Sequence, residues 1–327
     1  MTPLPTLRQL RYLTALAELG HFGRAAEACL VTQSTLSAGL QELETLLGAA
    51  LVERTTRHVT LTPLGHAVVA RARRLLADVQ DLIDEVRAAD DPLTGELRLG
   101  VIPTIAPYLL PRALPRLRAA YPRLRLILKE DLSDRLADAL KAADLDVLLL
   151  ALPWPLEGAE ILDLGDDPFL LAVPPDHPLA HGATIALPDL PSDELLLLGE
   201  GHCLREHALA ACRLVDRAGD GQGLVGTSLH TIVQMVAGGL GITLLPKMAV
   251  DAGALANAGL VAKPLADAEA KRRIGLAWRR SSPRKAEMLA LGEFFARALS
   301  DSGYPPPPAA ACRSAAGRSP DRQGPRE

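Results

Sequence analysis

A helical pattern runs without interruption from Thr62-Pro63 to about Ala89 and divides the chain into two unlike parts. Proline is favoured in the first turn of a helix, and no further proline follows within this stretch. A narrow apolar seam on an otherwise charged helix is typical of a coiled coil. Because one copy of the chain offers nothing nearby to cover the seam, the pattern predicts a dimer. The apolar residues recur in alternating steps of four and three at Val68, Ala72, Leu75, Val79, Leu82 and Val86.

Before this long helix, the sequence predicts three short helices. Thr32 is a suitable N-cap for the third of them. A tight link over 30–32 and small alanines at the expected crossing are typical of a helix-turn-helix DNA reader. A helical bundle with no role in DNA binding stays open on this pattern alone. The predicted helices cover Leu7–Leu19, 22–29 and Gln33–Leu47.

The start of the third helix carries short polar side chains that we expect to meet DNA. In a helix-turn-helix domain this end enters the major groove, where side chains reach base edges and phosphates. Two strands around a polar turn over 51–62 predict a wing. Residues 1–66 hold five basic and five acidic side chains and the whole chain has a net charge of -4, so one subunit should bind DNA modestly. The predicted DNA contacts are Thr32, Gln33, Ser34, Thr35, Ser37, Arg54 and Arg57.

Beyond the long helix, short aliphatic strands alternate with helices. Such strands indicate parallel α/β sheets that are covered on both faces. The segments 163–168 and 261–270 are predicted to cross between two lobes. Ligand sites in these folds lie between lobes and at the ends of strands, and Thr104 follows the first predicted strand. The predicted strands cover 97–102, 124–130, 147–152, 169–173, 195–198, 242–245 and 274–278.

These patterns divide the chain into four predicted segments. The last segment is polar and rich in proline, and is expected to be disordered because it cannot bury a core. No signal peptide is recognisable, and no apolar run approaches the roughly 18 residues of a membrane span, so we expect a cytoplasmic protein that does not contact the membrane. The segments are a winged helix-turn-helix domain over 1–66, a linker and dimerisation helix over 67–92, a two-lobed regulatory domain over 93–300 and a tail over 301–327.

Two cysteines nine positions apart, Cys203 and Cys212, lie at the start of a segment rich in Ala, Leu and Arg that predicts a helix over 204–215. Nine residues of α-helix advance roughly 13.5 Å. A disulfide needs α-carbons about 4.4 to 6.8 Å apart. The thiols therefore cannot pair while the helix stands, and oxidation would have to unwind it. We interpret the pair as a redox switch.

Cys203 is expected to be the more reactive thiol. It lies where the helix begins, beside His202 and one turn from Arg205, and a helix N-terminus with nearby cations lowers a thiol pKa. Cys212 lies among small apolar residues and is expected to be a packed thiol. Two other interpretations stay open: the cysteines also fit two small core residues, and Cys203 with His207 fits part of a metal site that lacks two further ligands.

From about residue 5 to 300 the chain resembles the LysR-type transcriptional regulators and, within that family, the OxyR peroxide sensors. The wider resemblance rests on the motifs FGRAAEA over 22–28, TQSTLS over 32–37, QELE over 41–44, LLG over 46–48 and LTPLG over 61–65. The narrower one rests on Cys212 and on the motifs IPTIAPYLLP over 102–111, EGHCLR over 200–205, TSL over 227–229, GITLLP over 241–246 and RRIGL over 272–276.

The resemblance implies a winged helix-turn-helix domain with a dimerisation helix and an α/β regulatory domain of the periplasmic-binding-protein type. It implies a dimer of dimers on promoter double-stranded DNA that works with RNA polymerase to activate antioxidant genes, with no cofactor and no enzymatic activity. Hydrogen peroxide would oxidise Cys203, Cys212 would resolve the product to a disulfide, and a thiol reductant would reset the switch. The peroxide pocket would be shaped by Thr104, Ser133, which stands where the sensors usually have Thr, His202, Arg205 and Arg272.

Two rival functions stay open. A LysR-type regulator that senses a small organic ligand between its lobes, with incidental cysteines, would respond even after thiol blocking, and its ligand would raise the melting temperature. A thiol peroxidase would turn over repeatedly with a reductant, but would have no use for a DNA reader.

Overall fold

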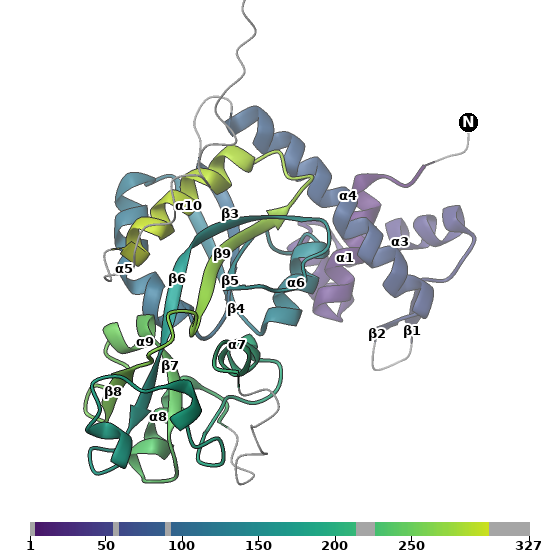
Figure 1. Cartoon of the computed structure of the whole chain (residues 1–327). Helices are drawn as coiled ribbons and strands as arrows, with labels where there is room; N and C mark the ends of the chain where they lie inside the picture. The colour runs from purple at the N-terminus through teal and green to yellow at the C-terminus, as the bar shows by residue number, and fades with distance from the viewer. Residues whose placement is uncertain (1–3, 55–58, 89–92, 214–225, 301–327) are drawn as a thin grey trace, which may run out of the picture.

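The computed structural model describes residues 4–54, 59–88, 93–213 and 226–300. A group of N-terminal helices, one long helix and a two-lobed α/β domain follow one another along the chain (Figure 1). Arg57 and the predicted tail over 301–327 lie outside the described residues. None of the helices in these ranges combines the length and the hydropathy needed to span a bilayer.

The N-terminal domain is formed by α1 (Leu7–Leu19), α2 (Phe22–Ala28), α3 (Gln33–Leu47) and the antiparallel pair β1 (Val52–Arg54) and β2 (Val59–Leu61). Local sequence signals fix these bounds. Gly20 ends α1 in a left-handed conformation with φ of 61°, which glycine adopts without strain. The hydroxyl of Thr32 accepts a hydrogen bond from the backbone N–H of Thr35 at 3.2 Å, which confirms the predicted N-cap of α3.

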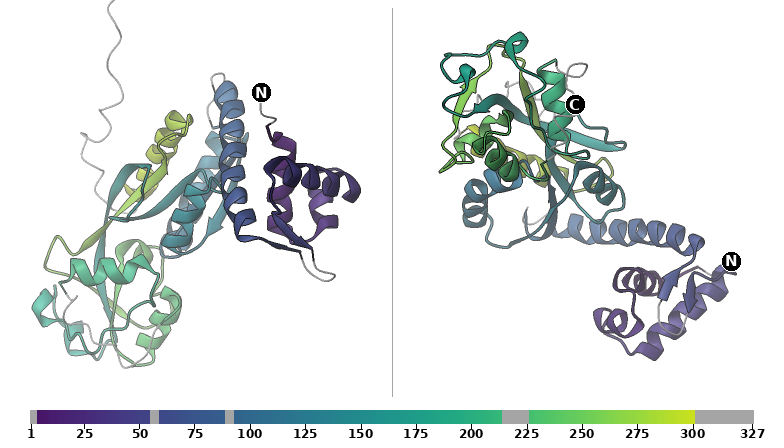
Figure 2. Two further views of the ribbon diagram at one scale, coloured as in Figure 1. Left: turned by 90° about the vertical axis from the view of Figure 1, so that its right-hand side faces the viewer. Right: turned by 90° about the horizontal axis from the view of Figure 1, so that it is seen from below.

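The long helix α4 (Pro63–Ala88) runs from the N-terminal helices to the regulatory domain (Figure 2). Val68 and Ala72, the first two residues of the predicted seam, pack against the core of the N-terminal domain. The prediction that one copy leaves the whole seam uncovered is therefore wrong for its first part. Further along, Leu75 and Leu82 are 52% and 61% exposed, so the uncovered part of the seam begins near the middle of α4.

The regulatory domain is built on a sheet whose strands run in the order β4-β3-β5-β9-β6-β7, with β8 also paired to β6. The predicted parallel arrangement is correct for β3 with β4 and β5, but wrong for β6 to β9, which pair antiparallel. β6 and β9 pass between the lobes in opposite directions, so they must pair antiparallel. The strands are β3 (Gly95–Val101), β4 (Leu124–Glu130), β5 (Val147–Leu152), β6 (Ala159–Val173), β7 (Thr243–Pro246), β8 (Val261–Pro264) and β9 (Lys271–Arg279).

Strand β6 belongs to both lobes. Its residues 159–168 pair with β9 in lobe 1, and its residues 169–173 pair with β7 and β8 in lobe 2. The predicted crossing at 163–168 is thus an unbroken part of a strand. The predicted strand over 195–198 is wrong, because within it only Leu195 and Leu198 form isolated bridges, to Ile242 and Gly226.

Each lobe has its own apolar core. Helices α5, α6 and α10 cover the sheet of lobe 1, and α8 and α9 pack on the strands of lobe 2 (Figure 1). The remaining helix, α7, lies where the lobes meet. The helices are α5 (Ala106–Ala120), α6 (Ser133–Lys141), α7 (Cys203–Ala211), α8 (Leu229–Ala237), α9 (Lys247–Asp251) and α10 (Lys285–Ser300), and short 3-10 turns cover Pro178–Ala180 and Leu187–Asp189.

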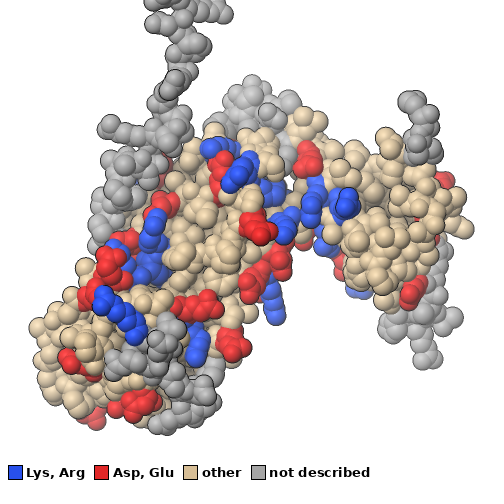
Figure 3. Space-filling view, turned by 45° about the vertical axis from the view of Figure 1, so that its right-hand side comes forward, with Lys and Arg blue, Asp and Glu red and all other residues tan. Residues whose placement is uncertain are grey.

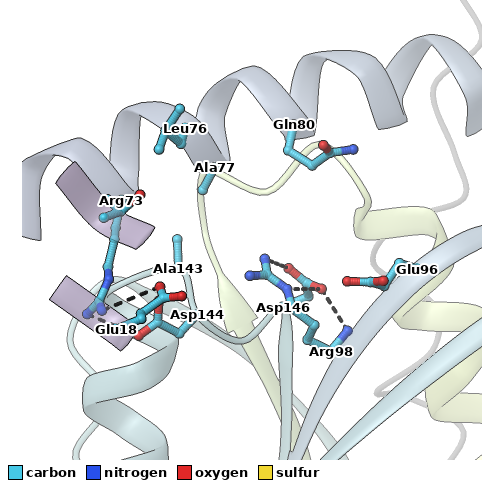
Figure 4. A pocket seen from close by; sticks show the side chains of 11 residues that line it. Glu18, Arg73, Leu76, Ala77, Gln80, Glu96, Arg98, Ala143, Asp144 and Asp146 are labelled. Carbon is cyan, nitrogen blue, oxygen red and sulfur yellow. Dashed lines mark hydrogen bonds and ion pairs between the residues drawn. The ribbon is translucent and has the colours of Figure 1, made fainter. Parts of the chain in front are cut away.

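A charged cleft of about 450 Å³ separates α1 and α4 from lobe 1 (Figure 4). Arg73 of α4 lies 3.6 Å from Glu18 of α1 and 3.6 Å from Asp144 of lobe 1. The face in Figure 3 shows basic and acidic side chains interspersed over α4 and the regulatory domain. Such partly exposed ion pairs contribute little each, so the N-terminal domain is held to lobe 1 only weakly at this cleft.

Leu82→Glu on the exposed part of the α4 seam should weaken self-association of the chain. Burying a leucine is worth about 1.5 to 3 kcal/mol, and a symmetric dimer loses the contact twice, so the dissociation constant should rise at least about tenfold. Sedimentation measures this. Arg74→Glu, on an exposed neighbouring face of α4, should leave association near that of the parent. If both variants have the same dissociation constant as the parent, the α4 seam does not pair with a second copy of the chain.

Candidate functional site

Helix α7 joins the cores of the two lobes. Cys203, its first residue, is buried in the core of lobe 1, whereas Leu204, Ala208 and Cys212 are buried in the core of lobe 2. The predicted helix over 204–215 is too long, because α7 ends at Ala211. Cys212 is the C-cap, Arg213 follows in a left-handed conformation with φ of 56°, and residues 214 and 215 lie outside the described residues.

Both thiols are free and inaccessible. Cys203 is 3% exposed and Cys212 is 1% exposed. A folded helix of this length holds them roughly 13.5 Å apart along its axis. They also belong to different cores, so pairing them requires α7 to unwind and at least one thiol to leave its core.

Burial dominates the chemistry of Cys203. Its pKa is raised above the ordinary 9.0, chiefly by desolvation, although the neighbouring Ser133 hydroxyl and the charge of Arg272 lower it. The Ser133 hydroxyl is buried and has no hydrogen-bond partner among the described residues. The prediction of a lowered pKa is therefore wrong for this conformation, because the loss of hydration outweighs the helix N-terminus and the nearby charge.

The positive charge that acts on Cys203 does not come from the predicted residues His202 and Arg205. Burial lowers the pKa of His202, which favours the neutral imidazole at pH 7. Arg205 is half-buried and is not among the groups that shift the pKa of Cys203. The positive charge comes instead from Arg272 on β9, distant in sequence but adjacent in space.

Arg272 is fully buried in a network of hydrogen bonds. Its Nε and Nη2 donate to one carboxylate oxygen of Asp167 at 3.0 Å each. Its Nη1 donates to the hydroxyl of Thr104 at 2.8 Å, and its Nη2 also donates to the Thr104 carbonyl at 3.0 Å. The other Asp167 oxygen accepts from the backbone N–H of Met248 at 3.0 Å. This charge-assisted network fixes the guanidinium behind Thr104.

Asp167 was missed in the sequence analysis. The sequence could have indicated a buried carboxylate, because Asp167 lies in the predicted crossing at 163–168 and is followed by apolar residues that must be buried. A buried carboxylate requires a cation, and Arg272 is that cation.

A narrow cleft opens onto Cys203. The structure brings Thr104, Ser133 and His202 to this cleft with Cys203, whereas the other two predicted pocket residues, Arg205 and Arg272, are not among the lining residues. In this conformation the cleft has no volume that a water-sized molecule could occupy. Ile102, Pro103, Leu132 and Gly201 complete its wall.

A second cavity of about 360 Å³ lies beside this cleft, between the lobes. It shares Thr104 and His202 with the cleft and adds Tyr108, Glu130 and Ser228. Its size is within the range of small-molecule sites. Among the described residues, no group of three His, Cys, Asp or Glu side chains could hold a metal ion.

The predicted DNA-contacting residues of α3 lie at its N-terminal end. Thr32, Gln33, Ser34 and Thr35 are exposed, whereas Ser37 is half-buried. The hydroxyl of Thr32 lies 2.9 Å from that of Ser34 and 2.8 Å from that of Thr35. Arg54 ends β1, and the structure does not describe its side chain.

The fold defines a DNA-binding regulator with a helix-turn-helix domain and a two-lobed sensory domain. A model of the bacterial regulatory helix-turn-helix protein, lysR family, matches residues 7–66, and a model of the LysR substrate binding domain matches residues 90–300. The chain belongs to the family of LysR-type transcriptional regulators. The predicted fold class is thereby confirmed.

Similar proteins within this family include peroxide sensors. The chain is 45% identical over 288 residues to the HTH-type transcriptional regulator EstR of Acinetobacter baylyi, covering 88% of this chain and 95% of the relative. It is 44% identical over 297 residues to a probable hydrogen peroxide-inducible genes activator of Streptomyces viridosporus, covering 91% and 95%. The structure of a full-length variant of OxyR from Pseudomonas aeruginosa matches with 37% identity and a TM-score of 0.77, covering 90% of this chain and 95% of that chain.

Arg272→Met should destabilise the regulatory domain by about 3 to 5 kcal/mol, because it leaves the Asp167 carboxylate buried without its cation. Denaturant unfolding measures the change in free energy. Arg273→Met is the matched control on the same strand: its side chain is 54% exposed, so its loss should cost less than about 1 kcal/mol. Equal losses in the two variants would contradict the structural role of the buried pair.

The raised pKa of Cys203 predicts slow alkylation at neutral pH. The thiolate is the reactive form, and below the pKa its fraction rises about tenfold for each pH unit. The rate of Cys203 modification by a neutral haloacetamide, followed by mass spectrometry, should therefore still be rising at pH 9.0, the ordinary thiol value. A rate that reaches its plateau below pH 7 would show that the thiol is already ionised in the reduced protein.

Proposed function

We propose that this regulator senses hydrogen peroxide through Cys203, and that Cys212 completes a reversible intramolecular disulfide. The observation that carries the proposal is the position of α7, which places two free thiols in two different cores. The relatives named as peroxide-inducible activators and as OxyR support peroxide as the signal. A disulfide between these thiols converts a local oxidation into a rearrangement of both lobes.

The oxidation consumes one peroxide for each switch. The Cys203 thiolate attacks one peroxide oxygen, the O–O bond breaks, and the hydroxide that leaves takes up a proton to form water. Cys212 then attacks the sulfenic sulfur through its thiolate, an S–S bond forms, and the sulfenic oxygen leaves as a second water. A dithiol reductant returns two electrons and restores both thiols. One such event changes the state of the regulator, so repeated turnover is not needed.

Polar groups around Cys203 suit this first step. A guanidinium can only donate, so the Thr104 hydroxyl accepts from Arg272 and keeps its own hydrogen for a partner in the cleft. The Ser133 hydroxyl and the neutral His202 offer further hydrogen bonds at the same cleft. The charge of Arg272 favours both the thiolate and the departing hydroxide.

Access to the thiol requires an opening of the cleft, since the closed form does not admit a water-sized molecule. Separation of His202 from Ser133 by a small movement of the loop before α7 would admit peroxide. The same movement hydrates Cys203 and removes the cause of its raised pKa. The closed form thus protects the thiol, and the open form reacts.

The disulfide would act on DNA through the fold. Unwinding α7 removes Leu204 and Ala208 from the core of lobe 2, so the lobes must repack. In a dimer of dimers paired through α4, this repacking would reset the spacing of the helix-turn-helix domains on promoter DNA and their contact with RNA polymerase. We propose that the exposed start of α3 reads the major groove with the residues Thr32, Gln33, Ser34, Thr35 and Ser37, and that Arg54 and Arg57 contact the backbone.

The cavity between the lobes supports a second candidate, a regulator that responds to a small organic ligand. It is favoured by the volume of the cavity and by the mixture of apolar and polar lining residues. In that case thiol blocking would leave the response intact, and a ligand would raise the melting temperature.

Cys203→Ser should abolish the transcriptional response to peroxide and leave DNA binding by the reduced protein unchanged. Cys212→Ser should still form a sulfenic acid at residue 203, but no intramolecular disulfide. Cys29→Ser, in the N-terminal domain, is the matched control and should respond like the parent. A reporter promoter measures the response, and mass spectrometry of alkylated protein identifies the linkage. An intact response in the Cys203→Ser variant would exclude the thiol switch and favour the organic-ligand candidate.

A further inference from the structure

Two residues of α7, four positions apart on one face of the helix, connect it to lobe 1. Cys203 lies in the core of that lobe. His207 reaches the chain just after β5, where its Nε2 lies 2.9 Å from the carbonyl oxygen of Pro153. Leu204 and Ala208 face the core of lobe 2 instead. The His207 hydrogen bond therefore holds α7 across the boundary between the lobes.

The protonation state of His207 follows from its partners. A carbonyl oxygen can only accept, so Nε2 carries the hydrogen and donates it to Pro153. The Nδ1 atom is buried and has no hydrogen-bond partner among the described residues. Burial lowers the pKa of the ring, which agrees with a neutral imidazole that is protonated on Nε2.

This hydrogen bond exists only while α7 is folded against lobe 1. His207 lies between the two cysteines, whose α-carbons must come within about 6.8 Å of each other in a disulfide. Unwinding the helix to that extent carries the imidazole away from Pro153, which directly follows the buried strand β5. The bond therefore stabilises the dithiol state and not the disulfide state. An interaction that favours the reduced form makes the pair a stronger oxidant, with a higher reduction potential.

We infer that His207 is a positioning residue that holds α7 on lobe 1 and thereby sets how readily the Cys203–Cys212 disulfide persists. The inference rests on the proposed disulfide switch and deepens it. The reduction potential of the cysteine pair then depends on the His207 side chain, although His207 neither reacts nor contacts the sulfur of Cys212. The peroxide level that keeps the regulator oxidised depends on His207 in the same way. Loss of one net hydrogen bond corresponds to a roughly two- to tenfold change in the equilibrium, or about 10 to 30 mV for a two-electron couple.

The test measures the reduction potential of the full chain equilibrated with mixtures of oxidised and reduced dithiothreitol. The oxidised fraction is read from the linked and the alkylated 203 to 212 peptides by mass spectrometry. His207→Leu and His207→Met remove the donor, and methionine keeps a high helix propensity should the branched side chain pack poorly. His207→Gln retains an amide donor that can reach the carbonyl. His181→Leu, at an exposed histidine, is the matched control.

We expect both donor-free variants to favour the disulfide by roughly two- to tenfold, with His207→Gln and His181→Leu within about twofold of the parent. The thermal unfolding midpoints of the reduced variants identify any that fail to fold. A potential equal to that of the parent in the donor-free variants overturns the inference, as does a shift in the opposite direction or an equal shift in His207→Gln. A parent chain that never links residues 203 and 212 overturns the proposed function itself, which separates the two failures.

Discussion

The two ends of the short helix α7 are buried in two different hydrophobic cores. Cys203 lies in the core of lobe 1 and Cys212 in the core of lobe 2, and the ordered backbone of α7 keeps the sulfurs apart. Both thiols are almost completely buried where they lie. In the proposed switch, a bond between the sulfurs opposes this packing and the short helix unwinds. The same constraint would then account for both the stability of the reduced form and its capacity to switch.

The environment of Cys203 balances two opposing effects. Burial raises its pKa, and the nearby guanidinium of Arg272 partly offsets the rise. Arg272 is itself paired with Asp167 in the interior and oriented by Thr104. The position of the cation therefore depends on β6, β9 and the loop after β3 together, so the reactivity of the thiol is coupled to how the two lobes are packed. In the proposed switch, the closed cleft and the raised pKa of Cys203 both limit oxidation until the cleft opens.

Local signals predicted local structure well. The bounds of α1 and α3 agree with the sequence because glycine termination and the Thr32 N-cap act within a few residues. Strand β5 was predicted with its observed bounds because its aliphatic run is continuous, and the bounds of β4 agree as well although Arg125, Lys129 and Glu130 interrupt its aliphatic residues. The direction of β6 to β9 and the partner of Arg272 could not be predicted, since both follow from how the chain crosses between the lobes. For the same reason, the sequence neighbours His202 and Arg205 were mistaken for the cation that acts on Cys203.

The central claim is that α7 is ordered in the reduced protein and gives up that order when the sulfurs join. Amide hydrogen exchange of residues 203–212, measured in the reduced chain and after stoichiometric peroxide, tests this most directly. The account predicts protected amides over α7 in the reduced form and loss of that protection in molecules whose sulfurs are linked. Undiminished protection in a fully linked sample would contradict it.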